Sequence, residues 1–98
     1  MEIEAKHCKK VAEILKNLSH PDRLMILCYL SMKPRNVNDL SELTGCSQSA
    51  VSQFLTRMKH QGLIESERDG HFVNYKIADP KIMELMESLH KIYGQDEA

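Results

Sequence analysis

Hydrogen-bonding side chains are concentrated in the segment 47–61, which contains no acidic residue. Several of them recur at helical spacing and therefore share one face of a helix. These residues are Ser49, Ser52, Gln53, Thr56 and His60, with Arg57 beside them. Short Ser and Thr side chains fit a major groove about 12 Å wide, and Gln can bond the edge of a base. The face is typical of a DNA-reading helix, whereas a solvent-facing helix is usually crowded with Glu and Lys.

Two further groups of residues extend this predicted DNA surface. Ser47 and Gln48 begin the same segment, and Arg68 and His71 lie at the tip of a predicted hairpin. From there Arg68 could reach a phosphate or a minor groove, and a solvated hairpin tip without a contact is the alternative. The predicted DNA-contacting residues are Ser47, Gln48, Ser49, Ser52, Gln53, Thr56, Arg57, His60, Arg68 and His71.

The sequence has three cysteines, Cys8, Cys28 and Cys46, which are far apart and form no CxxC pair. This pattern argues against a disulfide framework or a zinc ribbon and favours a reducing cytosol. Cys46 lies beside the start of the 47–61 helix, where the helix dipole favours a thiolate. Cys28 lies in an apolar helix, where burial keeps a thiol protonated and slow to react. If the protein senses oxidants, we expect Cys46 to respond before Cys28.

The helix that carries the polar face needs a second helix to hold it in place. Residues 39–44 form a short amphipathic helix with Leu40 and Leu43, and Gly45 suits the left-handed position that ends such a helix. Ser47 suits the N-cap of the next helix. The residues predicted to be apolar on the inner side of that helix are Val51, Phe54, Leu55 and Met58. Together the segments predict a helix-turn-helix, and a pair of surface helices in another α-helical domain is the alternative.

After this pair of helices, the hydrophobic period changes to that of strands. Residues 63–68 and 71–77 are predicted strands, and Asp69-Gly70 between them predicts a type I′ hairpin turn. A hairpin directly after a reading helix forms a wing. Residues 63–77 are therefore predicted to flank the DNA contact.

Three more helices are predicted around this unit. The first covers residues 4–18 and the last covers 80–93, with Asp79 as its N-cap and Pro80 as its first residue. Between the first helix and the helix-turn-helix, Ser19 is the expected N-cap of a helix that is apolar nearly all round. That helix should therefore form the buried centre of the domain.

The two terminal helices have more apolar surface than a small domain needs for its own core, which indicates a partner. We expect a two-fold homodimer, with packing of these helices onto the protomer's own core as the alternative. The predicted interface residues are Val11, Leu15, Ile82, Met86, Leu89 and Tyr93.

Length and composition limit the classes of protein. The chain of 98 residues is expected to be one domain, 1–98, and it has no apolar run near the ~20 residues of a membrane span, so we expect a cytoplasmic protein. The net charge of −1 does not by itself favour DNA, but residues 79–98 carry −3 and the remainder +2, so the acidic excess lies away from the reading helix. Because there is no nucleophile–base arrangement, Gly-rich phosphate loop or carboxylate pair, we predict no enzyme activity and no cofactor.

The predicted fold is mostly α (α+β), a winged helix-turn-helix with the order α-α-α-α-β-β-α and a dimer through the terminal helices. This order resembles the ArsR/SmtB family of winged-helix repressors over essentially the whole chain. The segments that carry the resemblance are HPDRLMILCYL, SQSAVSQFLTRMKHQGLI and YKIADP. The resemblance implies a dimer that represses transcription at a palindromic operator until a ligand or a modification releases it. Phe54 departs from the family, which often has His or Gln at that place.

Of the residues that hold metal ions in this family, this sequence retains only one, Asp79. The positions that match the thiolate pair of the metal sensors are Asn36 and Asn38. The positions that match the metal site of the last helix are Asp79, Lys81, Ile92 and Gln95. Because a single carboxylate that also caps a helix does not make a metal site, no metal is predicted.

Within the family, the chain is most similar to HlyU-like and sulfur- or redox-responsive members. These have one cysteine in the second helix, matched by Cys28, and another near the end of the last helix, where this chain has Gly94. HlyU-like proteins resemble activators that displace a silencing protein from DNA, so activation stays open beside repression. A winged-helix module that binds protein and not DNA is a further alternative, which the near-zero net charge favours.

Overall fold

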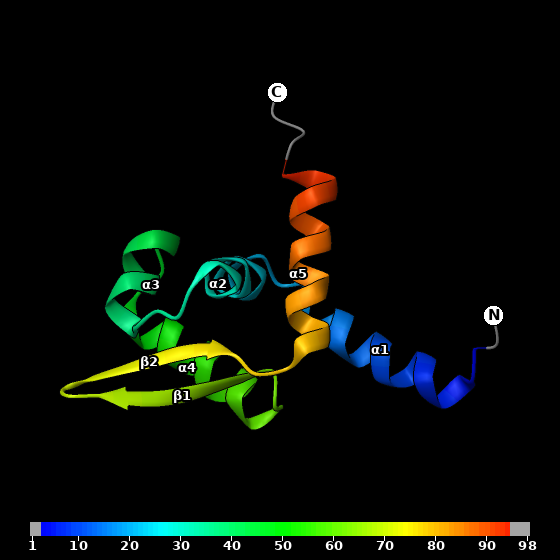
Figure 1. Cartoon of the computed structure of the whole chain (residues 1–98), viewed down its shortest axis with the longest axis horizontal. Helices are drawn as coiled ribbons and strands as arrows, with labels where there is room; N and C mark the ends of the chain where they lie inside the picture. Colours follow the sequence, from blue (N-terminus) through cyan, green and yellow to red (C-terminus); the bar gives the residue numbers. More distant parts are fainter. Residues whose placement is uncertain (1–2, 95–98) are drawn as a thin grey trace.

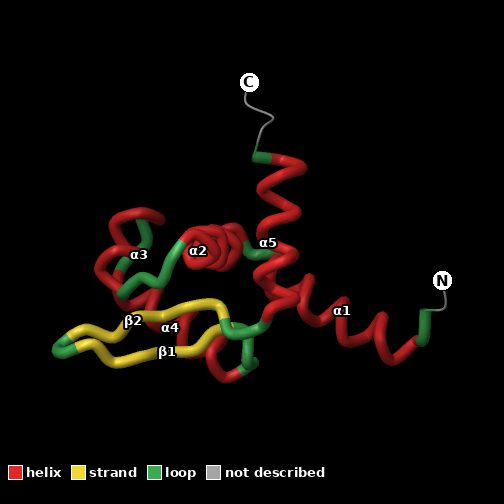
Figure 2. Tube along the Cα trace, in the orientation of Figure 1, coloured by secondary structure: helices red, strands yellow, loops and turns green. Residues whose placement is uncertain are grey.

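The computed structural model describes residues 3–94, which form five helices and a two-stranded antiparallel sheet (Figure 1). The elements in chain order are α1 (Ala5–Leu18), α2 (Pro21–Met32), α3 (Val37–Thr44), α4 (Gln48–His60), β1 (Ile64–Asp69), β2 (Phe72–Ile77) and α5 (Pro80–Tyr93). This order confirms the predicted winged helix-turn-helix, with the two strands packed beside α4 (Figure 2).

Local capping explains where most helices begin. The Ser47 hydroxyl accepts from the N–H of Ala50 at 3.1 Å, and Asp79 accepts from the N–H of Lys81 at 2.9 Å, which confirms both predicted N-caps. Gly45 ends α3 with a φ of 78°, the left-handed conformation that the sequence predicted. The turn between α3 and α4 is therefore encoded by the residues at its two ends.

The start of α2 differs from the prediction. Its N-cap is His20, whose Nδ1 accepts from the N–H of Asp22 at 3.2 Å, and not Ser19. Ser19 instead ends α1, because its hydroxyl donates to the carbonyl of Lys16 at 2.7 Å. Proline at the first helical position fixes the start of the helix at Pro21.

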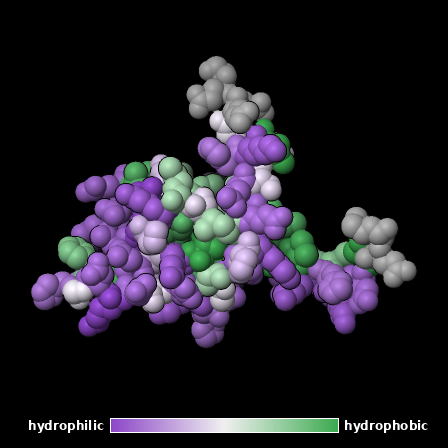
Figure 3. All heavy atoms as spheres, in the orientation of Figure 1, coloured by the Kyte–Doolittle hydropathy of each residue, from purple (hydrophilic) through white to green (hydrophobic). Residues whose placement is uncertain are grey.

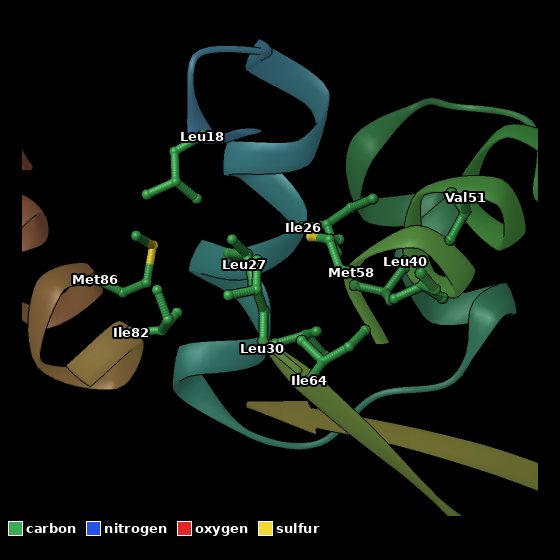
Figure 4. Close-up of a cluster of buried hydrophobic side chains, with 12 residues drawn as sticks. Leu18, Ile26, Leu27, Leu30, Leu40, Val51, Met58, Ile64, Ile82 and Met86 are labelled. Carbon is green, nitrogen blue, oxygen red and sulfur yellow. The ribbon is translucent and has the colours of Figure 1, made fainter. Parts of the chain in front are cut away.

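The hydrophobic core is built around α2, as predicted. Figure 4 shows Leu27 between Ile82 and Met86 of α5 on one side and Leu40, Val51 and Met58 of the helix-turn-helix on the other. Ile26 and Leu27 have no exposed surface. Burying such side chains stabilises the fold by roughly 1.5–3 kcal/mol each before the entropy of ordering is counted.

Two residues assigned to the dimer interface lie in this core instead. Ile82 is 2% exposed and Met86 is 1% exposed within the protomer. Side chains buried to this extent have no surface left to give to a partner, so their assignment to the interface was wrong. The inner side of α5 packs on α2, which was the alternative that the sequence left open for the terminal helices.

The hairpin turn also differs in type from the prediction. Asp69 pairs with Phe72, so the two loop residues are Gly70 and His71, and not Asp69 and Gly70. Of these two loop residues, Gly70 alone has a positive φ, at 62°, and among the described residues only glycines have a positive φ. A type I′ turn needs positive φ at both central residues, whereas a type II′ turn needs it at the first alone. The wing therefore closes with a II′ pattern.

The second strand of the wing is tied to the segment that follows α2 by the backbone of Arg35. Its N–H donates to the carbonyl of Tyr75 at 3.1 Å, and the N–H of Tyr75 donates back to the Arg35 carbonyl at 2.8 Å. The Arg35 side chain in turn donates through Nε to the Tyr29 carbonyl at 3.1 Å. These bonds fix the direction in which the hairpin leaves the body.

The first helix extends away from the body of the protomer, and α5 stands beside α2 (Figure 1). Leu18 is the only buried residue of α1, while Val11 and Leu15 are each 51% exposed. Figure 3 shows hydrophobic surface near the junction of α1 and α5, whereas the surface over the wing is mostly hydrophilic. Within residues 3–94, no helix combines the length and the apolar character that crossing a lipid bilayer requires.

Candidate nucleic-acid interface

The outer face of α4 is an open, shallow hollow of about 610 Å³. It is lined by Ser52, Gln53, Thr56, Arg57, His60 and Gln61. All ten residues predicted to contact DNA are exposed. The inner face, with Val51, Leu55 and Met58 buried, holds the helix on the core, so the polar side chains point outward as the period predicted.

The charged side chains of α4 are all basic and lie in its last turn. Its first turn contains no acid, and its last turn carries Arg57, Lys59 and His60. Lys59 was not among the predicted site residues, although it lies between two that were. Its Nζ donates to the Ser66 hydroxyl of β1 at 2.6 Å, which places an ammonium group where the reading helix meets the wing. Gln61, which also lines the hollow, could have been found from its position one turn after Arg57.

The start of α4 is tied to α3 by a side-chain bond. Gln48 donates through Nε2 to Asn38 Oδ1 at 2.6 Å, and both residues are exposed. This bond occupies one donor of the Gln48 amide, which was predicted to contact DNA. Gln53, which has no such partner among the described residues, has its whole amide free for a base edge.

The wing carries charges of both signs. Arg68 and His71 are exposed at its tip, as predicted, but Glu65, Glu67 and Asp69 alternate with them along β1. Lys76 forms ion pairs with Glu65 at 3.4 Å and with Glu67 at 3.9 Å. Arg68 has acidic neighbours, because Glu67 and Asp69 line the same hollow as Arg68. A phosphate that approaches Arg68 therefore meets a surface of mixed charge.

The three thiols differ in how far they are exposed to solvent. Cys8 is exposed, whereas Cys28 and Cys46 are partly buried, and all three are free. Burial raises the pKa of the Cys28 thiol, as the sequence predicted. Cys28 lines an apolar cavity of about 780 Å³ between α2 and α5, together with residues that include Leu24, Met32 and His90. Gly94 also lines this cavity, so no second thiol faces Cys28 across it.

Cys46 lies in the turn that joins the two helices of the helix-turn-helix. Its N–H donates to the Thr44 hydroxyl at 3.2 Å, and its carbonyl accepts from the Ser41 hydroxyl at 2.6 Å. Its backbone is therefore held at both sides, directly before the Ser47 cap. Its side chain is partly buried and packs against the hydrophobic core.

The predicted metal positions and the dimer positions can also be placed. Within residues 3–94, no group of three His, Cys, Asp or Glu side chains is arranged to hold a metal ion, and Gln95 lies outside the described residues.

Four predicted interface residues remain accessible: Val11 and Leu15 on α1, and Leu89 and Tyr93 on α5. Ile92, which is 60% exposed, adds to the same surface of α5.

A helix-turn-helix whose second helix presents an acid-free polar face, followed by a β-hairpin, defines a winged helix-turn-helix DNA-binding protein. The family model described as "Bacterial regulatory protein, arsR family" matches residues 20–66. The chain belongs to the ArsR family of DNA-binding transcriptional regulators, a family without enzyme activity.

Several members of the family are similar to this chain over most of its length. The HTH-type transcriptional regulator YgaV of Escherichia coli is 41% identical over 86 residues, or 87% of each chain. The biofilm growth-associated repressor of Xylella fastidiosa is 33% identical, covering 94% of this chain and 81% of that protein. The transcriptional activator HlyU of Vibrio cholerae is 32% identical, covering 92% of this chain and 83% of that protein.

Solved structures share the fold. Reduced HlyU from Vibrio cholerae has a TM-score of 0.87 at 32% identity, covering 92% of this chain and 95% of that chain. The homodimeric winged helix-turn-helix domain of Mb0332 from Mycobacterium bovis has a TM-score of 0.75 at 26% identity, covering 96% of this chain and 92% of that chain.

Proposed function

We propose that this regulator is a cytoplasmic homodimer that represses transcription by reading a palindromic operator with two copies of α4. The observation that carries the proposal is the exposed, acid-free face of α4 around Gln53 and Arg57. Its Ser, Thr and Gln side chains can bond base edges, and Arg57, Lys59 and the exposed Arg68 of the wing can contact phosphates.

A homodimer supplies the symmetry that a palindromic site requires. The exposed apolar side chains of α1 and α5, chiefly Leu15, Ile92 and Tyr93, support an interface there, and the Mycobacterium bovis domain of the same fold is homodimeric. Two reading helices that meet one face of the duplex are separated by one helical turn, about 34–36 Å. We therefore expect half-sites with centres one turn apart.

A gel-shift experiment with the promoter of the protein's own gene tests the DNA function. The dissociation constant is measured against that promoter and against a scrambled duplex of the same length, at two salt concentrations. We expect tighter binding to the promoter at both concentrations and weaker binding to both duplexes at higher salt. A chain that binds neither duplex at low salt would be a protein-binding module of the same fold.

The second candidate is an activator that displaces a silencing protein from DNA. The similarity to the transcriptional activator HlyU of Vibrio cholerae favours it, whereas the similarity to the biofilm growth-associated repressor of Xylella fastidiosa favours repression. Transcription from a bound promoter, measured in cells with and without the gene, separates the two. Deletion raises transcription under a repressor and lowers it under an activator, and the activator's effect disappears when the silencing protein is also absent.

A further inference from the structure

The guanidinium group of Arg23, near the start of α2, contacts both α1 and α4. Its central carbon is 5.6 Å from the centroid of the Phe54 ring on α4, within the range of a cation–π contact. Its Nη1 donates to Asn17 Oδ1 of α1 at 3.4 Å. Its Nε is buried and meets no hydrogen-bond acceptor in the described part of the chain. Arg23 thus connects α1 with α4 from within α2.

The ring of Phe54 is contacted by a second side chain from the start of α2. The centroid of the His20 ring lies 5.1 Å from that of Phe54, with the planes tilted by 54°. Aromatic rings attract each other in tilted arrangements at this distance. His20 is itself held in place, because its Nδ1 caps α2 by accepting from the N–H of Asp22. Phe54 is therefore held by two residues, Arg23 and His20, whose own positions are fixed by hydrogen bonds.

These contacts are directional, unlike the apolar contacts that hold the inner face of α4 on the core. Val51, Leu55 and Met58 attach the helix to the core through apolar burial, which depends on area and little on orientation. The contacts of Arg23 and His20 with the Phe54 ring depend on ring position. Gln53 directly precedes Phe54 in the same helix, so any rotation of α4 that moves Phe54 also turns Gln53.

We propose that Arg23, His20 and Phe54 are positioning residues for operator reading, which set the rotation of α4 about its own axis and join it to α1. The inference rests on the proposed DNA function. The cluster is poorly suited to stability alone, because an apolar side chain in place of Arg23 would leave no buried N–H without an acceptor. Its value lies in the direction in which Gln53 and Arg57 point.

The test compares variants of the full chain on two duplexes, an operator selected by the unaltered protein from random sequences and a scrambled version of it. The variants are Arg23→Met, Phe54→Leu, their double variant, Phe54→Tyr and His20→Asn. Asn retains the cap of α2 and removes the ring that faces Phe54. Lys9→Met is the control, because it removes one positive charge from an exposed position on α1, which extends away from the wing (Figure 1).

We expect Arg23→Met and Phe54→Leu each to weaken operator binding by about tenfold, the scale of one directional contact, with a change below about threefold on the scrambled duplex. The double variant should lose no more than the worse single variant, because both remove the same contact. Phe54→Tyr should retain operator binding. His20→Asn should weaken binding to the operator and leave binding to the scrambled duplex unchanged. The thermal midpoint of Arg23→Met should stay within a few degrees.

Three results would overturn the inference: additive losses in the double variant, equal losses on both duplexes, or operator binding that Arg23→Met and His20→Asn leave unchanged. If Phe54→Leu does not fold by circular dichroism, the decision rests on Arg23→Met and His20→Asn, which retain the apolar packing of α4. A failure of the proposed DNA function would be distinct, because the unaltered protein would then select no operator.

Discussion

At the scale of single residues, base reading depends on side chains that have no partner inside the protein. Within residues 3–94 Gln53 meets this condition, whereas the Gln48 amide already donates to Asn38. Of the residues on α4, Gln53 is therefore the best placed to make two bonds with the edge of an adenine.

Replacing Gln53 with Ala should weaken operator binding by about 1–3 kcal/mol, the usual value of a good bidentate contact, and leave a scrambled duplex nearly unaffected. The measurement is a pair of binding isotherms at one salt concentration. Gln48→Ala is the matched comparison and should cost less. An equal loss on both duplexes would show that Gln53 does not read sequence.

The thiols should differ in reactivity. Because burial raises the pKa of Cys28, its thiolate forms only at a higher pH than that of an ordinary thiol, so iodoacetamide should label Cys28 more slowly than the exposed Cys8. The rate at Cys28 should also rise at a higher pH. Mass spectrometry of digested protein over a pH series measures both rates, and equal rates in denaturant serve as the control.

For Cys46 we propose the closer connection to DNA binding. Its sulfur belongs to the turn before the Ser47 cap, so peroxide or persulfide modification there should weaken operator binding through the position of α4. The modified fraction at each cysteine is compared with the lost binding. A Cys8–Cys28 disulfide that releases DNA, or full binding after complete modification of Cys46, would reverse the ranking of the thiols.

At the scale of elements, the apolar stripes of α1 and α5 divide into an inner and an outer part. Ile82 and Met86 face α2, while Leu15 and Tyr93 stay exposed. A substitution that tests dimerisation must therefore use the outer part, because a charge at Met86 would disrupt the core of the protomer.

Leu15→Asp should place a charge in the proposed apolar interface, cost several kcal/mol of association energy and give a monomer in analytical ultracentrifugation. Operator binding should be lost with it, because a monomer carries a single reading helix. Lys9→Ala, which makes the same change of net charge on the polar side of α1, should remain dimeric. A Leu15→Asp dimer with intact binding would place the interface elsewhere.

Sequence reasoning succeeded for features that depend on neighbours in the chain. The Gly45 stop, the Ser47 and Asp79 caps and the inner face of α4 follow from local spacing, and all were confirmed. It failed where tertiary contacts decide. Periodicity identified the stripe of α5 but could not show that Ile82 faces α2, and the pairing of Asp69 with Phe72 moved the turn by one residue.

At the scale of the whole molecule, the net charge of −1 means that DNA binding must rely on where the charges lie. The last turn of α4 supplies Arg57 and Lys59, and the tip of the wing supplies Arg68. The acids of the wing are partly neutralised by Lys76.

Each phosphate contact should therefore be visible in the salt dependence of binding. Arg57→Ala and Arg68→Ala should each reduce the slope of log K against log salt by about one unit, because one counterion fewer is released. Lys9→Met, an exposed position on α1, which extends away from the wing (Figure 1), should leave the slope unchanged. An unchanged slope for Arg68→Ala would show that Arg68 contacts no phosphate and that the hairpin tip stays in solvent.

The extension of α1 away from the body has a consequence for how the chain folds. An isolated helix of this length is marginal in water, and α1 buries only Leu18 within its own protomer. In the proposed homodimer, association would supply further packing for α1, so the folding of this helix should depend on protein concentration by mass action. Diluting the protein below its dimer dissociation constant should reduce helical ellipticity, and the thermal midpoint should rise with protein concentration. In the proposed dimer, the concentration of the protein in the cell would therefore affect how far α1 is helical.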